Sequence, residues 1–287
     1  MAIEEMDAQE KKLQQLKHII KGYEKLAIAF SGGVDSTFLA KVAQEVLGDN
    51  AMVITVQAPT LKNEELDDII DFHQETGMKH EIFQLNQFNI KEFRENVPLR
   101  CYFCKTGVFE NILKTAKKYG IHTVADGTNM DDLKDYRPGL KALGELGIVS
   151  PLKDAGLTKN DIRYFSKQYG LKTWNKPSSG CLATRIPYGE EITQEKLDRI
   201  DAAEKVLAKL GLKQLRVRYH DNQMARIEVS PKDREKFFDM KLMDTISAQF
   251  RQIGFTYTTL DMSGYRSGSL NEVLNEQQTQ VAEHESK

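Results

Sequence analysis

The 287-residue sequence has little of several features that mark special classes of protein. It contains three cysteines, too few for a disulfide framework, so we expect reduced thiols, metal ligands or reactive groups. It lacks a run of about eighteen apolar residues, which argues against a transmembrane helix. Its first residues, Met-Ala-Ile-Glu-Glu-Met-Asp, are acidic and have no apolar segment typical of a secretory signal. The sequence therefore predicts a cytoplasmic protein with no membrane partner.

An excess of charge of either sign is also missing. Forty basic and 42 acidic residues give a formal net charge of −2, and 40% of the residues are hydrophobic. This balance argues against a disordered chain and against nonspecific binding of nucleic acid, so we expect no nucleic-acid partner. The length is sufficient for one large domain or two of ordinary size.

The most informative stretch lies near the N-terminus. An apolar run over residues 26–30 predicts a buried strand, Ser31-Gly32-Gly33 predicts a turn, and apolar spacing over residues 35–47 predicts a helix. A strand–turn–helix of this kind directs free backbone N–H groups and the positive end of a helix dipole at one small volume. The glycines remove side chains that would block a phosphate, and Ser31, Ser36 and Thr37 add hydroxyl donors. The sequence therefore predicts an anion site.

The string Ser-Gly-Gly-Val-Asp-Ser-Thr resembles the PP-loop of the ATP pyrophosphatases, which split ATP into AMP and pyrophosphate. It is not a P-loop, because the Gly-Lys-Ser/Thr ending is missing. It is not a dinucleotide fingerprint, because no third glycine follows at the required spacing. The alternative is an ordinary strand–turn–helix whose glycines only form the turn.

Strands and helices alternate along the first part of the chain. Further strands are expected at residues 51–56, 80–85 and 121–125, with helices between them, and this order predicts an α/β domain over residues 1–188. Its sheet should be mostly parallel, with helices on both faces. Ligands of such sheets bind beyond the carboxyl ends of the strands, where Ser31–Gly33 and Asp126-Gly127 fall. Residues 126–146 are expected to be a long loop. Thr158-x-x-Asp161 resembles a capping box that starts a helix to about Tyr169.

The C-terminal part has a different pattern. A helix is expected at 193–210, a β-hairpin at 214–229, a helix at 232–251 and a strand at 257–261. This order predicts a small α+β domain over residues 189–287.

Two sets of side chains are candidates for chemistry. Cys101 and Cys104 form a Cys-x-x-Cys at the start of an expected helix, and Cys181 lies in a later glycine-bearing loop. Such thiols suit an iron–sulfur cluster, but zinc, a redox pair or metal-free thiols remain possible. Arg216 and Arg218 alternate on an expected strand and project from the same face, which favours either a phosphate site or a solvated sheet face.

Over residues 15–272 the sequence resembles the LarE family, the ATP-dependent sulfur transferases of nickel-pincer cofactor synthesis. The shared motifs include the PP-loop, Asp126-Gly127, residues 135–142, Trp174-Asn175-Lys176, Arg185, Arg216-Val217-Arg218 and Arg266-Ser267-Gly268. The resemblance implies that ATP adenylates a carboxylate of pyridinium-3,5-biscarboxylic acid mononucleotide, and that sulfur then displaces AMP. In members with one cysteine, the residue at the position of Cys181 gives up its own sulfur. Cys101 and Cys104 place this sequence with the three-cysteine branch, which implies sulfur carried on a [4Fe–4S] cluster.

The resemblance also implies roles for individual residues. ATP would be bound by Ser31, Gly32, Gly33, Asp35, Ser36, Thr37 and Gly127, with Mg²⁺ on the phosphates and Asp35 as its candidate contact. Cys101, Cys104 and Cys181 would be the catalytic cluster ligands, and Lys105 would neutralise charge at the reacting centre. The substrate phosphate would be bound by Arg216 and Arg218, with Arg185, Arg226, Arg266 and Ser267 as weaker candidates. A homo-oligomer is implied.

Other functions remain as alternatives. A PP-loop tRNA thiolase also pairs a cluster with ATP, but it would need a basic surface or an added RNA-binding module. An NAD or GMP synthetase would share the PP-loop without needing the three cysteines. A noncatalytic nucleotide-binding protein or iron–sulfur carrier is a further alternative. Finally, the same sulfur transfer could consume Cys181 as the sulfur donor.

Overall fold

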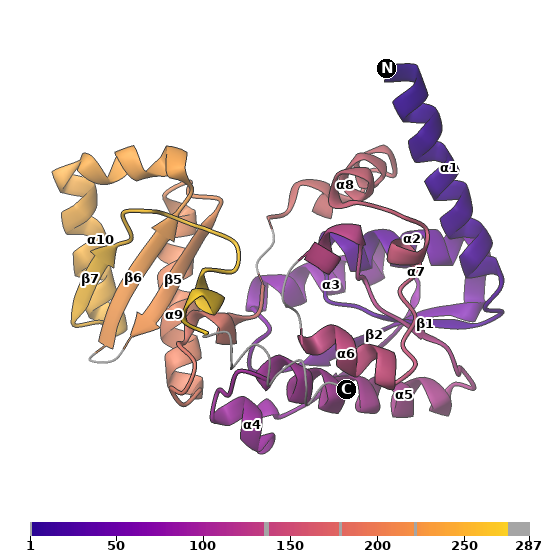
Figure 1. Ribbon diagram of the computed structural model, residues 1–287, viewed down its shortest axis with the longest axis horizontal. Coiled ribbons are helices and arrows are strands. Elements are labelled where there is room, and N and C mark those ends of the chain that lie inside the picture. Colours follow the sequence, from indigo (N-terminus) through magenta and orange to yellow (C-terminus); the bar gives the residue numbers. More distant parts are fainter. Residues whose placement is uncertain (1, 135–137, 178–179, 221–222, 275–287) are drawn as a thin grey trace. The chain divides into compact units, whose positions relative to one another are not determined.

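The structure, a computed structural model, describes residues 2–134, 138–177, 180–220 and 223–274 (Figure 1). The chain forms two compact units. The first contains residues 1–86 and 101–178, and the second contains residues 87–100 and 179–287. The domain boundary at residue 188 stays a prediction, and each unit is described by itself.

The first unit is built on a four-stranded sheet in the order β3-β2-β1-β4. Its strands are β1 (Leu26–Ala29), β2 (Ala51–Gln57), β3 (Lys79–Gln84) and β4 (Val124–Ala125). All three pairings are parallel, and Ala125 also forms a parallel bridge with Val149. The predicted parallel sheet is therefore confirmed.

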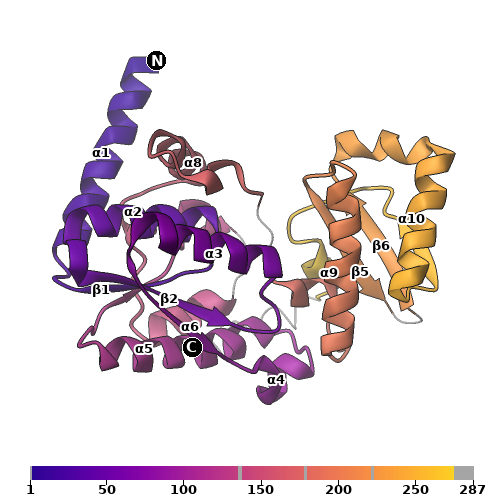
Figure 2. The same cartoon turned by 180° about the vertical axis from the view of Figure 1, so that it is seen from behind.

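Helices cover both faces of this sheet (Figures 1 and 2). One face carries α1 (Ala2–Lys21), α2 (Val34–Leu47), α3 (Asn63–Thr76), α7 (Pro151–Asp154) and α8 (Lys159–Gln168). The other carries α5 (Arg100–Lys118) and α6 (Pro138–Glu145).

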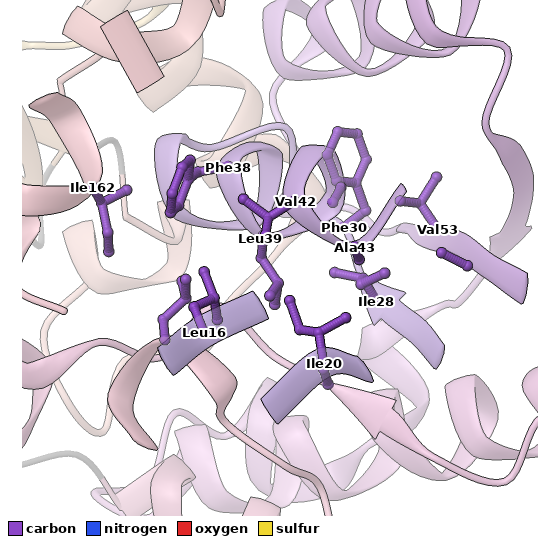
Figure 3. Close-up of a cluster of buried hydrophobic side chains, with 14 of the residues drawn as sticks. Leu16, Ile20, Ile28, Phe30, Phe38, Leu39, Val42, Ala43, Val53 and Ile162 are labelled. Atoms are coloured by element: carbon purple, nitrogen blue, oxygen red, sulfur yellow. The ribbon is translucent and has the colours of Figure 1, made fainter. Parts of the chain in front are cut away.

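The side chains of β1 alternate between the two layers. Leu26 and Ile28 pack into one hydrophobic cluster with α1, α2 and α8, part of which Figure 3 shows. Ala27 packs into a second cluster with α5 and α6. All three side chains are fully buried. Because side chains of a strand point alternately to opposite faces, burial on both faces produces the continuous apolar run read in the sequence.

The sequence pattern predicts the start of α8 correctly, but it does not predict the short helices between β4 and α8. The capping box that starts α8 is confirmed, since Thr158 Oγ1 accepts from the Asp161 amide and Asp161 Oδ2 accepts from the Thr158 amide at 3.0 Å. The expected loop over residues 126–146 is wrong in part, because it contains α6 and a 3₁₀ turn, η3 (Met130–Lys134). Residues 135–137 of that loop, which belong to a shared motif, lie outside the described residues.

The second unit is a three-stranded sheet, in the order β5-β6-β7, with two main helices. β5 (Leu215–His220) and β6 (Met224–Val229) are antiparallel, and β7 (Tyr257–Leu260) pairs parallel with β6. The hairpin is confirmed, although residues 221–222 of its turn lie outside the described residues. The helices are α9 (Gln194–Lys209) and α10 (Met240–Ile253).

The single helix expected over residues 232–251 is wrong. The segment forms a 3₁₀ helix, η7 (Pro231–Phe238), followed by α10. Asp239 separates them, and its Oδ1 accepts from the Lys241 amide at 2.8 Å. An aspartate in this position caps a new helix, because it satisfies amides that have no partner in the first turn.

A short segment from the first half of the chain completes the second unit. It contains η2 (Gln87–Asn89) and α4 (Lys91–Arg94). The Asn96 side-chain amide donates to the carbonyls of Ile186 and Pro187, at 3.2 and 2.6 Å. The buried Arg100 guanidinium donates to the Ala183 carbonyl at 3.1 Å. In the part of the chain that the structure describes, no helix is long and apolar enough to cross a membrane.

Candidate functional site

The Ser31–Thr37 loop joins the buried end of β1 to the N-terminus of α2. The Ser36 hydroxyl donates to the Gly33 carbonyl at 3.3 Å and lies 3.2 Å from the Ser31 hydroxyl, which holds the loop in a compact shape. Within the described residues, no side chain caps α2 at Gly33, and no group hydrogen-bonds the buried Thr37 hydroxyl. Free amides and a buried hydroxyl at one helix N-terminus suit an anionic ligand.

Two glycines allow close packing around this loop. Gly32 has φ of +66°, and a Cβ there would lie 2.8 Å from Ile69 Cγ1 of α3. Gly127 follows β4, and a Cβ there would lie 3.2 Å from both Asp35 Cβ and the Ser36 amide nitrogen. The structure thus brings Gly127 and the PP-loop together, as the sequence predicted from the ends of the parallel strands.

Asp35 lies in the first turn of α2 between two polar partners. Lys159 Nζ of α8 is 2.5 Å from Asp35 Oδ2, and the Asn129 side-chain amide donates to Asp35 Oδ1 at 3.3 Å. Burial raises the pKa of the Asp35 carboxyl, and the positive charge of Lys159 opposes that rise. The carboxylate is therefore partly desolvated, a state in which a divalent cation would be an effective partner.

A second carboxylate fixes the loop after β4. Asp126 is buried, and its two oxygens accept hydrogen bonds from the hydroxyls of Ser150, at 2.7 Å, and Thr128. Its own amide donates to the Val149 carbonyl at 3.0 Å. These bonds hold Gly127, and hence its contact with Asp35, in one position.

The three cysteines are outside any disulfide and are divided between the two units. Cys101 and Cys104 lie three residues apart in the first turn of α5 and are half-buried, so both occupy one face of the helix. Cys181 is exposed and precedes η5 (Leu182–Arg185) in the second unit. Within neither unit do the described His, Cys, Asp and Glu residues form a group of three suited to a metal. Residues 178–179, next to Cys181, lie outside the described residues.

Lys105 lies one turn along α5 from Cys101. Its stem passes close to Gly139 of α6, where a Cβ would be 2.7 Å from Lys105 Cδ. The same Cβ would be 3.4 Å from the Cys101 carbonyl oxygen. Gly139 therefore leaves space for the side chain of Lys105 beside the Cys-x-x-Cys turn.

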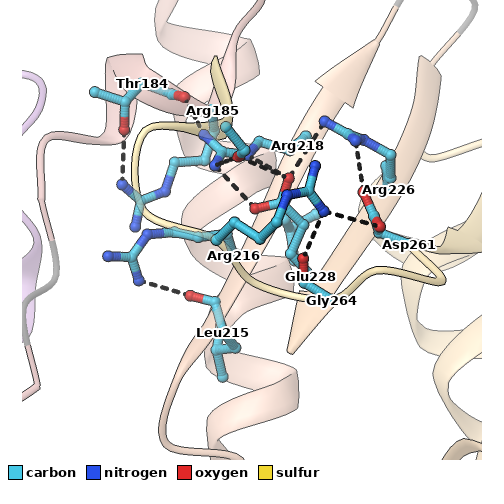
Figure 4. Close-up of polar contacts among 12 residues, drawn as sticks. Thr184, Arg185, Leu215, Arg216, Arg218, Arg226, Glu228, Asp261 and Gly264 are labelled. Atoms are coloured by element: carbon cyan, nitrogen blue, oxygen red, sulfur yellow. Dashed lines mark hydrogen bonds and ion pairs between the residues drawn. The ribbon is translucent and has the colours of Figure 1, made fainter. Parts of the chain in front are cut away.

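Buried arginines form the candidate phosphate site in the second unit (Figure 4). Arg185 makes a two-point ion pair with Glu204 of α9, at 2.8 and 3.1 Å. Arg218 of β5 makes another with Glu228 of β6, at 3.0 and 2.8 Å. Because two-point pairing fixes the guanidinium plane, Arg185 is held rigidly against α9 and Arg218 within the sheet.

Arg216 lies close to another buried cation, Arg185. Burial lowers the pKa of Arg216 to about 10, and the positive charge of Arg185 adds to that effect. Its guanidinium stacks 5.1 Å from the Tyr265 ring centroid. A Cβ on Gly180 would lie 3.5 Å from Arg185 Nη1 and 3.9 Å from Arg216 Nη2, so the glycine leaves space beside both cations. Such a site favours an incoming anion.

The weaker candidates lie further along the same unit. Arg226 of β6 pairs with Asp261 at 2.7 Å and approaches Glu228 at 3.3 Å. Arg266 is more exposed and pairs with Glu272 at 3.1 Å. Ser267 is exposed.

Sequence reasoning missed the groups that hold these side chains. Predicted site residues are contacted from other elements by four such groups: Lys159, Asn129, Glu204 and Glu228. For Lys159, 124 residues separate the two partners, and no local pattern signals such a pair. A glutamate that aligns with an apolar helix face, as Glu204 does between Ala203 and Leu207, was the available signal for a buried partner.

Comparison with known proteins agrees with this geometry. The family model described as NAD synthase matches residues 7–99, which contain the PP-loop. An uncharacterized protein of Synechocystis is 44% identical over 92% of this chain and 98% of its own length. An uncharacterized protein of Methanocaldococcus jannaschii is 34% identical over 90% of this chain and 98% of its own.

Another relative, with a named activity, is the pyridinium-3,5-bisthiocarboxylic acid mononucleotide synthase of Lactiplantibacillus plantarum. It is 36% identical over 260 residues, which are 90% of this chain and 93% of the synthase. With this match and a PP-loop at the end of a parallel strand, the chain belongs to the family of the pyridinium-3,5-bisthiocarboxylic acid mononucleotide synthase, LarE.

Proposed function

We propose that this chain is an ATP-dependent sulfurtransferase that converts pyridinium-3,5-biscarboxylic acid mononucleotide to its thiocarboxylates. The observation that carries the proposal is the 36% identity with the Lactiplantibacillus plantarum synthase over nearly the whole of both chains. The PP-loop supports the use of ATP, and the three cysteines support the delivery of sulfur. We propose a homo-oligomer that acts in the cytoplasm on this small molecule, with no nucleic acid as partner.

The first half-reaction would activate the substrate carboxylate, whose carbon is a poor electrophile before adenylation. An oxygen of the substrate carboxylate attacks the α-phosphorus of ATP, the bond to the bridging oxygen breaks, and pyrophosphate leaves. The amides in the first turn of α2, which have no partner within the helix, would bind the phosphates and the departing pyrophosphate, because charge accumulates there. Asp35 would contact Mg²⁺ on the phosphates, and Lys159 would then be released from its ion pair.

The second half-reaction would form the carbon–sulfur bond. Sulfur attacks the carbonyl carbon of the acyl adenylate, and AMP leaves with the electron pair of the broken carbon–oxygen bond. We propose Cys101, Cys104 and Cys181 as ligands of a [4Fe–4S] cluster, a donor set of three thiolates that fits such a group. When bound, the cluster would supply an iron with an open position for sulfide. Lys105 would neutralise negative charge beside the Cys-x-x-Cys turn.

For the substrate phosphate, Arg216 is the leading candidate. Its buried guanidinium lies beside a second cation, Arg185, and its pKa is depressed, so an anion would relieve the repulsion between them. Arg218 would support the site through its pair with Glu228. Arg226, Arg266 and Ser267 stay weaker candidates.

The test combines metal analysis with product analysis on the anaerobically purified full chain. We expect about four irons and four sulfides per chain and an absorbance band near about 400 nm. With ATP, Mg²⁺, sulfide and the substrate, mass spectrometry should detect AMP, pyrophosphate and the thiocarboxylate. Colourless protein with stoichiometric zinc would contradict the cluster, and product without AMP would contradict the adenylate.

The same assay separates the cluster from a consumed cysteine. Product should exceed one sulfur per chain in the wild type, and Cys101→Ala should abolish the reaction with added sulfide. If Cys101→Ala still transferred one sulfur per chain while Cys181→Ala transferred none, Cys181 would be the sulfur donor. Modification of tRNA in place of the mononucleotide would favour the tRNA thiolase.

A further inference from the structure

Lys176 connects the PP-loop to helix α3. It directly follows η4 (Lys172–Asn175) in the first unit. Its Nζ lies 3.3 Å from the Gly32 carbonyl oxygen, to which it donates, and 2.5 Å from Asp68 Oδ2 of α3. The loop, the helix and the ammonium group therefore meet at one point.

The position of Lys176 is fixed from two sides. Its own carbonyl accepts a hydrogen bond from Arg163 Nη2 of α8 at 2.9 Å. Its side chain is 22% exposed, against 43% for Asp68. Gly32 packs against α3 at Ile69, one residue from Asp68. The ammonium is thus held beside the second residue of the loop, while its stem is long enough to change partner.

A neighbouring lysine provides a comparison within the same turn. Lys172 of η4 pairs with Glu75 and, at 3.9 Å, with Asp71, both on α3. Its side chain is 70% exposed. Both lysines therefore link η4 to α3 through carboxylates, but Lys176 also contacts the PP-loop.

We propose that Lys176 binds the phosphates of ATP, and that Asp68 holds it in place when no nucleotide is bound. The proposal rests on the proposed use of ATP by this chain. A solvent-accessible lysine–carboxylate pair is weak. ATP carries about four negative charges near neutral pH, and Asp68 carries one, so phosphates at the loop compete effectively for the ammonium. Lys176 would leave Asp68 and keep its place beside Gly32.

The charge would matter most when pyrophosphate departs. The leaving group gains negative charge as its bond to the α-phosphorus breaks, and a preorganised cation stabilises that charge. Lys176 would then act on the leaving group as well as on the affinity for ATP, and it would remain bound to the released pyrophosphate. Affinity for pyrophosphate alone therefore reports its contact without any chemical step.

The test measures binding of MgATP and of magnesium pyrophosphate to the full chain by calorimetry. We expect Lys176→Met to weaken both by roughly tenfold, the effect of one charge-assisted hydrogen bond. Lys172→Met is the matched control, because it removes a cation from the same turn and the same helix partner. We expect it to leave both affinities within about twofold of the wild type.

Asp68→Asn should change the affinity for MgATP in the opposite direction to Lys176→Met. If Lys176 moves to the phosphates, neutralising its competitor should tighten MgATP severalfold. Equal affinities for wild type, Lys176→Met and Asp68→Asn, with lowered melting temperatures in both variants, would overturn the proposal and leave a structural ion pair. Wild-type protein that binds neither ligand would instead overturn the proposed use of ATP itself.

Discussion

Arg216 and Glu228 are directly opposite each other across the β5–β6 pair, but the Glu228 carboxylate makes its two-point ion pair with Arg218. The sheet therefore holds two arginines of different character on one face (Figure 4). Arg218 is fixed by a buried carboxylate, whereas burial and the neighbouring Arg185 lower the pKa of Arg216 to about 10. Local destabilisation of this kind is typical of binding sites.

Replacing the two arginines should therefore have different effects. We expect Arg216→Met to change the free energy of unfolding by no more than about 1 kcal/mol, because removing a charge that burial disfavours offsets the loss of its hydrogen bond to the Leu215 carbonyl. The same variant should lose at least about tenfold in affinity for a mononucleotide phosphate. Arg218→Met should instead lower the free energy of unfolding by about 3–5 kcal/mol, since it removes the two-point partner of a buried carboxylate. Urea denaturation and calorimetry measure the two quantities, and equal destabilisation by both variants would contradict the assignment.

A methyl group on Gly32 should disturb the PP-loop. We expect Gly32→Ala to destabilise the protein by about 2–4 kcal/mol and to abolish ATP binding, because φ is +66° and the new Cβ would contact Ile69. Gly77→Ala is the control, since its backbone is left-handed with φ of +61° and no atom lies within 4 Å of its Cβ. It should cost only the backbone term of about 1–2 kcal/mol, and thermal unfolding would measure the difference. Equal costs would show that the contact with α3 is unimportant.

His80 should stay neutral at physiological pH. Burial, together with the nearby His73, lowers its pKa to about 4. Its Nε2 lies 2.9 Å from the Thr55 hydroxyl, which itself donates to the carbonyl of Phe30, the residue before the PP-loop. The ring nitrogen must therefore be the donor, so the Nε2–H tautomer is expected. Titration by NMR should place the pKa well below 6, and a value near 6.5 would contradict the burial of the ring.

The same shift predicts how stability changes in acid. Because the unfolded chain takes up a proton near pH 6.5 and folded His80 only near pH 4, stability should fall as the pH drops through this window. His80→Gln cannot titrate and should flatten that part of the curve of unfolding free energy against pH. An unchanged slope in the variant would assign the acid sensitivity to other groups.

The pKa of Asp161 predicts a second pH range, lower than that of His80, in which stability falls. Burial raises its pKa, but hydrogen bonds from Lys12, Thr158 and Gln9 outweigh this and lower the pKa to about 2. Its contribution is therefore complete above the unfolded pKa of about 3.9 and is lost as the pH falls through about 2. We expect Asp161→Asn to cost about 2 kcal/mol at pH 7, with the difference from wild type shrinking between about pH 4 and pH 2.

Much of the fold could be predicted because its causes are local. The apolar run before Ser31 required a strand buried on both faces, and Thr158 with Asp161 defined a helix start within four residues. The break at Asp239 was missed because the apolar spacing continues through it, and only the cap marks the new helix. The placement of residues 87–100 in the second unit was not predictable from spacing, since hydrogen bonds from Asn96 to residues 90 or more positions away determine it.

The candidate site was predictable only where it is continuous in sequence. The PP-loop residues follow one another, and strand alternation indicated that Arg216 and Arg218 share a face. Which arginines are already held in ion pairs depends on Glu204 and Glu228. Their carboxylates bind Arg185 and Arg218 from other elements. Pattern reasoning identifies cations, but it does not reveal which of them are already paired. The roles of the three cysteines stay a prediction.

The burial of β1 on both faces has a consequence for hydrogen exchange. Leu26, Ala27 and Ile28 are fully buried, and the Phe30 amide donates to the Ile54 carbonyl at 2.9 Å. Backbone amides in such a strand exchange with solvent only when the unit unfolds as a whole. A ligand that binds only the folded loop slows this opening by the factor 1 + [L]/Kd, with [L] the free ligand concentration. Exchange at the amides of β1 therefore gives a direct measure of nucleotide affinity from residues that never touch the nucleotide.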